Sequence, residues 1–167
     1  MIAVSSFSRA DTCRLGSIVA ASLRAGDTVV LTGELGGGKT AFVCGAVQGL
    51  GSVDFVSSPT YAIVQEYDGP VAIAHADLYR IENSRELFDI GFEELFDGTR
   101  IVFVEWGDRA QDILPDSYLH VSFRHCDHPD QREVKIAGEG SDWQGRIVVI
   151  ATAVRATEGF QLSDASQ

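Results

Sequence analysis

The sequence is short of basic side chains and of long hydrophobic runs. It has 13 lysines and arginines against 24 aspartates and glutamates, which gives the 167 residues a formal net charge of −11 at pH 7. A molecule this acidic repels phosphate backbones, so the chain alone is not expected to bind DNA or RNA. The longest apolar stretch near the C-terminus, residues 147–154, is far shorter than the ~20 residues of a membrane-spanning helix. No membrane segment is expected.

The chain also has no recognisable secretion signal and few cysteines. Its first residues, MIAVSSFSRAD, contain no basic leader followed by a sustained apolar stretch. The three cysteines, Cys13, Cys44 and Cys126, are odd in number and show no CxxC spacing. This argues against a disulfide framework and suits a reducing compartment. Both observations favour a cytoplasmic location.

Lysine and asparagine are scarce as well. The only lysines are Lys39 and Lys135, so a lysine inside the one glycine-rich loop is not readily attributed to chance. Asn83 is the only asparagine, and a serine follows it. The chain therefore lacks an Asn-Lys-x-Asp motif, with which GTPases recognise guanine. This absence favours ATP over GTP as the nucleotide.

The glycine-rich stretch GELGGGKT, residues 33–40, carries the clearest chemical signal. It fits G-x-x-x-x-G-K-[ST] and lies between a β-branched run at 28–32 and a helical pattern at 39–50, the context that a phosphate-binding loop requires. Glycines at 33, 36, 37 and 38 are expected to take positive φ and approach an anion closely. Lys39 is predicted to reach the β- and γ-phosphates of ATP, and the Thr40 hydroxyl to ligate Mg²⁺. The alternative is a glycine-rich turn without a ligand.

Two carboxylates end predicted buried strands. Asp77 follows VAIAHA and Glu105 follows RIVFV, and ligand sites in open α/β sheets form at such carboxyl ends. Glu105 is assigned to Mg²⁺, directly or through water, and Asp77 to orienting water or another ligand. Thr60, in the loop SSPT, is a candidate for sensing the γ-phosphate or placing the attacking water. Solvated acids and an ordinary turn are the alternatives.

The remaining pattern predicts one α/β domain with a mixed parallel and antiparallel sheet, a three-layer sandwich like that of P-loop NTPases. Helices are expected at 10–25 and 82–90, and strands at 100–104, 118–124 and 133–136. Asp68-Gly69 predicts an antiparallel hairpin of 62–67 with 71–76. Residues 143–153 fit either a helix or a strand. The domain is expected to span 1–157, with 158–167 a loosely held tail.

Four stretches together resemble the bacterial TsaE (YjeE) family. They are GELGGGKTAFVCGAVQGLG, VSSPTYAIVQEY, HADLYRI and VEW, in this order, within a resemblance that covers about residues 8 to 137. The resemblance implies an α/β P-loop protein that binds ATP with Mg²⁺ and hydrolyses it slowly. It also implies two partner subunits, with which the protein supports formation of threonylcarbamoyladenosine at adenosine 37 of tRNA, so that tRNA is reached only indirectly.

The family's functional positions carry over onto matching residues. Gly37 stands where alanine is commoner, and Cys44 where a basic residue is often seen. For Arg132, a candidate contact to the base, no sharp motif fixes the alignment. The resemblance implies phosphate binding by Leu35, Gly36, Gly37, Gly38, Lys39 and Thr40, a magnesium side of Thr40 and Glu105, catalytic roles for Lys39, Thr60, Asp77 and Glu105, and a functionally sensitive Trp106.

Other readings stay open at this point. A small-molecule kinase would also need a P-loop and Mg²⁺, and Arg80, Arg109 and Arg124 would suit phosphoryl transfer to an acceptor. A nucleotide-dependent assembly switch is compatible with the family resemblance. The sequence HCDH, residues 125–128, offers metal-binding side chains, although adjacent residues rarely converge on one tetrahedral metal.

Overall fold

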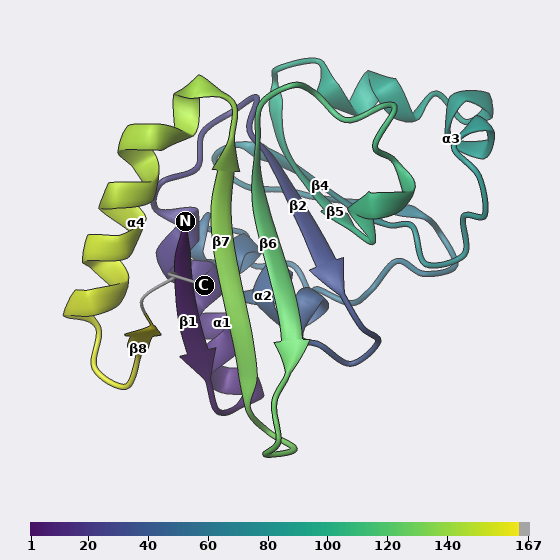
Figure 1. Cartoon of the computed structure of the whole chain (residues 1–167). Coiled ribbons are helices and arrows are strands. Elements are labelled where there is room, and N and C mark those ends of the chain that lie inside the picture. The colour runs from purple at the N-terminus through teal and green to yellow at the C-terminus, as the bar shows by residue number, and fades with distance from the viewer. Residues whose placement is uncertain (164–167) are drawn as a thin grey trace.

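The computed structural model describes residues 1–163 and contains an eight-stranded sheet of order β3-β4-β5-β2-β6-β7-β1-β8. The four central strands β4, β5, β2 and β6 run parallel, and the flanking pairs are antiparallel. The predicted mixed sheet is therefore confirmed (Figure 1). The strands are β1 (Ile2–Ser6), β2 (Thr28–Gly33), β3 (Val64–Tyr67), β4 (Ala72–Asp77), β5 (Arg100–Glu105), β6 (Tyr118–His125), β7 (Arg132–Glu139) and β8 (Gln161–Ser163).

Helices pack on both faces of this sheet, but unequally. One apolar cluster joins the sheet to α1, α2 and α4, and a second joins β4 and β5 to α3 and η1. Strand β5 shows the division, since Ile101 and Phe103 belong to the first cluster and Val102 and Val104 to the second. The helices are α1 (Arg9–Ala20), α2 (Lys39–Gly49), α3 (Arg85–Asp89) and α4 (Gln144–Ala156), with short 3-10 helices η1 (Phe92–Phe96), η2 (Gly107–Arg109) and η3 (Ser141–Trp143).

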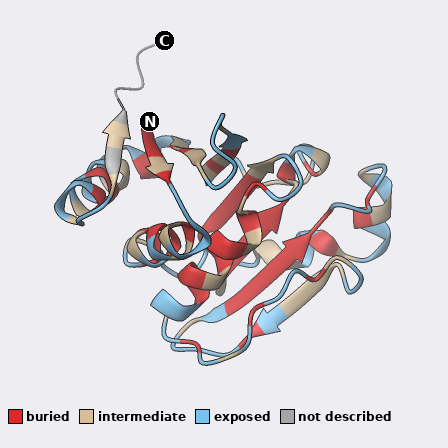
Figure 2. Ribbon diagram, turned by 90° about the horizontal axis from the view of Figure 1, so that it is seen from below, coloured by how far each residue is buried: buried red, intermediate tan, exposed pale blue. Residues whose placement is uncertain are grey.

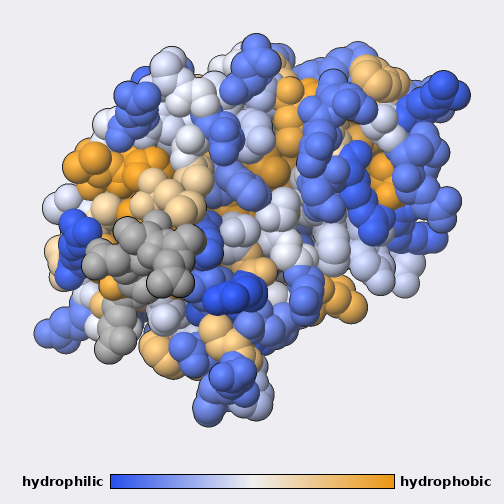
Figure 3. Space-filling view, viewed as in Figure 1, coloured by the Kyte–Doolittle hydropathy of each residue, from blue (hydrophilic) through white to orange (hydrophobic). Residues whose placement is uncertain are grey.

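The three-layer arrangement is complete only over the β4–β5 part of the sheet. Strand β6 alternates buried with partly exposed residues, the pattern of a sheet that is covered on one face. Buried residues run through the central strands, and exposed residues line the outer surfaces of helices and loops (Figure 2). The face drawn in Figure 3 is largely hydrophilic, with a hydrophobic group over α4, where Val148 and Val149 are exposed.

Most predicted elements form, with several differences. The helix expected at 82–90 covers only Arg85–Asp89. The helix expected at 10–25 ends at Ala20, because the chain turns before Gly26, which has a φ of +88°. Residues 143–153, which the sequence left open, belong largely to α4. Strand β1 was not predicted, and it pairs with β7 far along the chain. The predicted hairpin of β3 with β4 is confirmed.

The last part of the chain completes one edge of the sheet. Residues 161–163, which the sequence analysis placed in a loosely held tail, form β8 and pair with β1. Residues 164–167 of that predicted tail lie outside the described residues. No helix within residues 1–163 combines the length and apolarity needed to cross a membrane.

Candidate functional site

A cleft of about 560 Å³ opens at the carboxyl ends of the parallel strands. The glycine loop and the start of α2 form one wall, and the ends of β4 and β5 form its base. Ser8, Arg9 and Thr12 from around the start of α1 and Arg132 from β7 also line it. The cleft gathers most of the predicted site residues, namely Leu35, Gly36, Gly37, Gly38, Lys39, Thr40, Thr60, Asp77, Glu105, Trp106 and Arg132.

The glycine loop adopts the conformation of a phosphate cradle at three of its four glycines. Gly33, Gly36 and Gly38 have φ values of +129°, +75° and +109°, and a Cβ on Gly33 would lie 2.3 Å from the Phe123 carbonyl oxygen. The expectation of a positive φ at Gly37 is wrong. A Cβ there would lie 3.0 Å from the Glu34 carbonyl oxygen, so a small shift would accommodate the alanine that is commoner in the family.

Lys39 lies on the floor of the loop with only 4% of its surface exposed. Its Nζ donates hydrogen bonds to the Gly33 and Glu34 carbonyl oxygens at 2.7 and 2.9 Å and lies 3.9 Å from the Trp106 ring centroid. Burial lowers the pKa of Lys39, whereas the nearby carboxylates of Glu105, Asp77 and Asp108 act in the opposite direction. The amino group is therefore held within the loop at the base of the cleft.

Thr40 and Glu105 meet across the cleft from α2 and β5. The Thr40 hydroxyl donates to Glu105 Oε1 at 2.8 Å, and Glu105 is 3% exposed. Both side chains offer hard oxygen ligands of the kind that Mg²⁺ takes. The two side chains therefore fit a magnesium ion held beside the phosphate loop.

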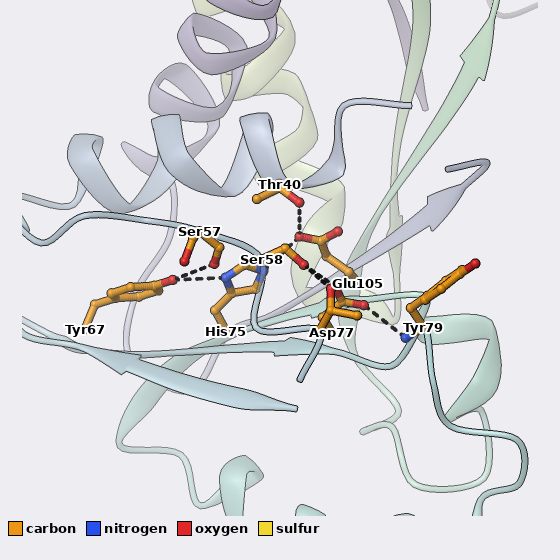
Figure 4. A network of polar contacts seen from close by, with 9 residues as sticks. Thr40, Ser57, Ser58, Tyr67, His75, Asp77, Tyr79 and Glu105 are labelled. Atoms are coloured by element: carbon orange, nitrogen blue, oxygen red, sulfur yellow. Dashed lines mark hydrogen bonds and ion pairs between the residues drawn. The ribbon is translucent and has the colours of Figure 1, made fainter. Parts of the chain in front are cut away.

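Asp77 occupies the matching position on β4 and binds the segment that precedes β3. Its Oδ2 accepts hydrogen bonds from the hydroxyls of Thr60, at 2.7 Å, and Ser58, and its Oδ1 accepts one from the Tyr79 N–H at 3.0 Å. The hydroxyl oxygens of Ser58 and Thr60 also lie 2.7 Å apart. The predicted switch-like loop is thus tied to a buried carboxylate at the cleft (Figure 4).

A second set of polar contacts was missed from the sequence. His75 is fully buried, and its Nε2 lies 2.9 Å from Glu105 Oε1. Its Nδ1 lies 3.2 Å from the hydroxyl of Tyr67, which in turn lies 3.4 Å from the Ser57 carbonyl oxygen. Figure 4 shows these side chains in one row beneath Thr40. The available signal was strand periodicity, which places positions 75 and 77 on the same face of β4.

Trp106 follows β5 directly and has an unusual backbone. Its φ of +60° is rare for a bulky residue, and its ring packs against Tyr79 at a centroid distance of 5.2 Å. The Lys39 amino group also lies over this ring, and the indole forms part of the cleft wall. Trp106 is partly exposed and so combines packing with access to the cleft.

Leu35 and Arg132 lie at the outer rim. Leu35 is 70% exposed, and its carbonyl oxygen lies 3.3 Å from His125 Nε2. Arg132 donates to the Gly36 carbonyl oxygen at 3.3 Å, so it reaches the phosphate loop from β7. Within residues 1–163 no cluster of three or more His, Cys, Asp or Glu side chains could hold a metal, so metal binding by residues 125–128 finds no support.

The three arginines considered for a kinase bind other groups of the chain, and Arg109 also lies over the rings of Tyr79 and Trp106 behind the cleft lining. Arg80 lies over the Tyr61 ring, Arg109 donates to the Ile81 carbonyl oxygen at 2.6 Å, and Arg124 pairs with Glu133 at 3.1 Å. None of the three lines the cleft formed by the described residues. The observed geometry gives no support to phosphoryl transfer to an acceptor.

Comparison with known proteins identifies the family. The model of the family described as threonylcarbamoyl adenosine biosynthesis protein TsaE matches residues 6–134, which include the glycine loop and both strand-end carboxylates. The chain belongs to the TsaE family. The TsaE resemblance predicted from four sequence motifs is therefore confirmed.

Individual relatives agree with this result. The tRNA threonylcarbamoyladenosine biosynthesis protein TsaE of Treponema pallidum is 40% identical over 68% of this chain and 84% of its own. The TsaE of Bacillus subtilis is 35% identical over 80% and 84%. A crystal structure of Bacillus subtilis YdiB superposes with a TM-score of 0.74 at 26% identity, covering 93% of this chain and 97% of that one.

Proposed function

We propose that this chain is a Mg²⁺-dependent ATP-binding protein and slow ATPase. In this proposal it acts in the cytoplasm with two partner subunits to support formation of the threonylcarbamoyl group on adenosine 37 of tRNA. The observation that carries the proposal is the meeting of Lys39, Thr40 and Glu105 around one phosphate loop. Membership of the TsaE family supports the tRNA-modification role.

The phosphate groups of ATP would bind along residues 35–40. The left-handed backbone at Gly36 and Gly38 and the N-terminus of α2 direct N–H groups at an anion. Lys39 would exchange its two carbonyl partners for phosphate oxygens. Thr40 and Glu105 would hold Mg²⁺, which when bound neutralises charge on the phosphates. Arg132, which donates to the Gly36 carbonyl oxygen at the rim of the cleft, is the candidate contact to the base of the nucleotide.

Hydrolysis would depend on Asp77 and Thr60. Their hydrogen bond, at 2.7 Å, holds a hydroxyl and a carboxylate at the cleft, where they can orient a water molecule toward the γ-phosphate. Turnover by the isolated chain is expected to be low. The cleft arginines, Arg9 and Arg132, have no motif that marks an arginine finger, and such a residue accelerates phosphoryl transfer by roughly 10³- to 10⁵-fold.

The acidic charge argues that tRNA is reached through the partners. With a formal net charge of −11, the chain alone would repel a phosphate backbone. Filter-binding titrations of tRNA at several salt concentrations test this point. Weak or absent binding by the isolated chain is expected, and tight, salt-sensitive binding would overturn it.

Phosphate release by the purified chain, with and without the two partner subunits, tests the ATPase proposal. We expect slow, Mg²⁺-dependent release that Lys39→Ala abolishes, because this substitution removes the charge facing the phosphates. Fast hydrolysis by the chain alone would contradict the expected low turnover. An unchanged Lys39→Ala variant would contradict the assignment of the phosphate loop.

A further inference from the structure

His75 is a buried polar residue that the proposed function does not yet use. It is 0% exposed and comes from the middle of β4, between apolar neighbours. A buried imidazole without partners would be costly, and both of its nitrogens have one. The question is therefore what this pair of hydrogen bonds does for the site.

The hydrogen-bond donors along this row can be assigned from chemistry. Glu105 Oε1 offers only lone pairs to His75 Nε2 at 2.9 Å, so Nε2 carries the proton and donates. In the neutral ring Nδ1 is then an acceptor. The single proton of the Tyr67 hydroxyl has two acceptors within reach, Nδ1 at 3.2 Å and the Ser57 carbonyl oxygen at 3.4 Å, and the shorter contact assigns it to Nδ1. Burial raises the pKa of Tyr67 to about 12, so the phenol keeps the proton that this bond needs. Tyr67 thereby selects the imidazole tautomer that faces Glu105.

Glu105 is consequently held from two directions at one oxygen. Oε1 accepts from Thr40 on α2 and from His75 on β4, whereas for Oε2 residues 1–163 provide no hydrogen-bond partner. Two donors on one oxygen fix the plane of the carboxylate and leave the other oxygen for a ligand. Side chains that orient metal ligands in this way commonly change metal affinity or activity by roughly 10- to 100-fold when removed.

We propose that His75, with its tautomer set by Tyr67, is the positioning residue that orients Glu105 toward a magnesium ion. This inference rests on the proposed function, since it assigns Glu105 to the metal side.

The test compares His75→Leu with His75→Gln. Leucine removes the donor, whereas glutamine carries an amide Nε2 that can replace the imidazole donor to Glu105. His120→Leu is the matched control, because His120 is a half-buried histidine in the same sheet, 2.8 Å from the Thr32 hydroxyl and outside the cleft lining. ATP binding is titrated calorimetrically over a range of Mg²⁺ concentrations and again in EDTA.

His75→Leu is expected to raise the Mg²⁺ concentration for half-maximal binding by about 10-fold or more and to leave the affinity in EDTA unchanged. His75→Gln should restore most of the loss, and His120→Leu should match the parent. An unchanged Mg²⁺ requirement in His75→Leu, or no recovery in His75→Gln, would overturn the inference alone. A parent chain that shows no Mg²⁺-dependent ATP binding would overturn the proposed function, and the inference with it.

A nucleotide-free measurement examines the same claim separately. Imidazole ¹⁵N NMR of the four histidines, with His75 assigned through its variants, should show the Nε2-protonated tautomer in the parent. Tyr67→Phe should shift this residue toward a mixture of tautomers. A His75 protonated at Nδ1 and not at Nε2 in the parent would overturn the inference, because Nε2 could not then donate to Glu105.

Discussion

Glu105 and Asp77 are partners in register on adjacent parallel strands, and both are 3% exposed, yet their surroundings differ. Glu105 is bound by α2 and β4, two elements of regular secondary structure. Asp77 is bound mainly by hydroxyls of a loop. Two equivalent positions at the carboxyl end of the sheet therefore differ in the elements that bind them. Under the proposed function, the Glu105 region would hold a ligand in fixed geometry, and the Asp77 region would connect the cleft with the loop before β3.

That segment has a strained end. Ile63, just before β3, has a φ of +66°, which is unusual for a β-branched residue. Such a conformation costs about 1–3 kcal/mol and persists where the surroundings enforce it. Here the Ile63 N–H donates to the Pro59 carbonyl oxygen and its own carbonyl accepts from the Asp77 N–H. Asp77 therefore stabilises the loop through its backbone as well as its side chain.

Among variants that compare the two carboxylate regions, the largest effect is expected from Glu105→Gln. Glutamine keeps the volume and an oxygen acceptor for Thr40 but removes the charge that favours a cation. Mg²⁺-dependent phosphate release should fall by roughly 100-fold or more, while ATP binding in EDTA is retained. Phosphate release over a Mg²⁺ titration measures this. If phosphate release by the variant depended on Mg²⁺ as it does in the parent, Glu105 would not be the metal-side carboxylate that distinguishes it from Asp77.

Asp77→Asn should act on turnover rather than on binding. The amide weakens the hydrogen bonds from Ser58 and Thr60, so we expect hydrolysis to fall by about 10- to 100-fold. Single-turnover rates and calorimetric ATP affinities separate the two quantities. A large loss of ATP affinity with unchanged turnover would assign Asp77 to the same task as Glu105.

A smaller loss is expected for Thr60→Val, which keeps the side-chain shape and removes only the hydroxyl. Ser58 still donates to Asp77, so turnover should fall by about 10-fold. Thr152→Val is the control, because the Thr152 hydroxyl is exposed on α4 and bonds within its own helix. Equal losses in both variants would show that the effect is one of general stability.

The smallest effect concerns Tyr67 and the free energy of unfolding of the chain at alkaline pH. The pKa of Tyr67 is raised to about 12 in the folded chain, against ~10 when unfolded. Between these values the unfolded state loses the phenolic proton first, so the free energy of unfolding should fall as pH rises from 10 to 12. Urea unfolding of the parent and of Tyr67→Phe measures the difference. An identical pH dependence in both would place Tyr67 in ordinary solvent-like surroundings.

The sequence predicted the residues whose signal is local. The glycine loop, Asp77 and Glu105 are each marked by a strand that ends beside them, so their convergence followed from parallel pairing. His75 and Tyr67 could not be identified as a pair, because their partnership depends on the antiparallel register of β3 with β4. Strand β1 was missed because its partners, β7 and β8, lie at the far end of the chain.

The most direct test of the account is calorimetric titration of the purified chain with ATP at millimolar Mg²⁺, beside Lys39→Ala. Lys39 lies at the base of the cleft between the phosphate loop and Trp106, so all proposed roles depend on nucleotide reaching it. The account predicts saturable binding by the parent and a loss of that binding in the variant. No binding by the parent, or equal binding by both, would contradict it.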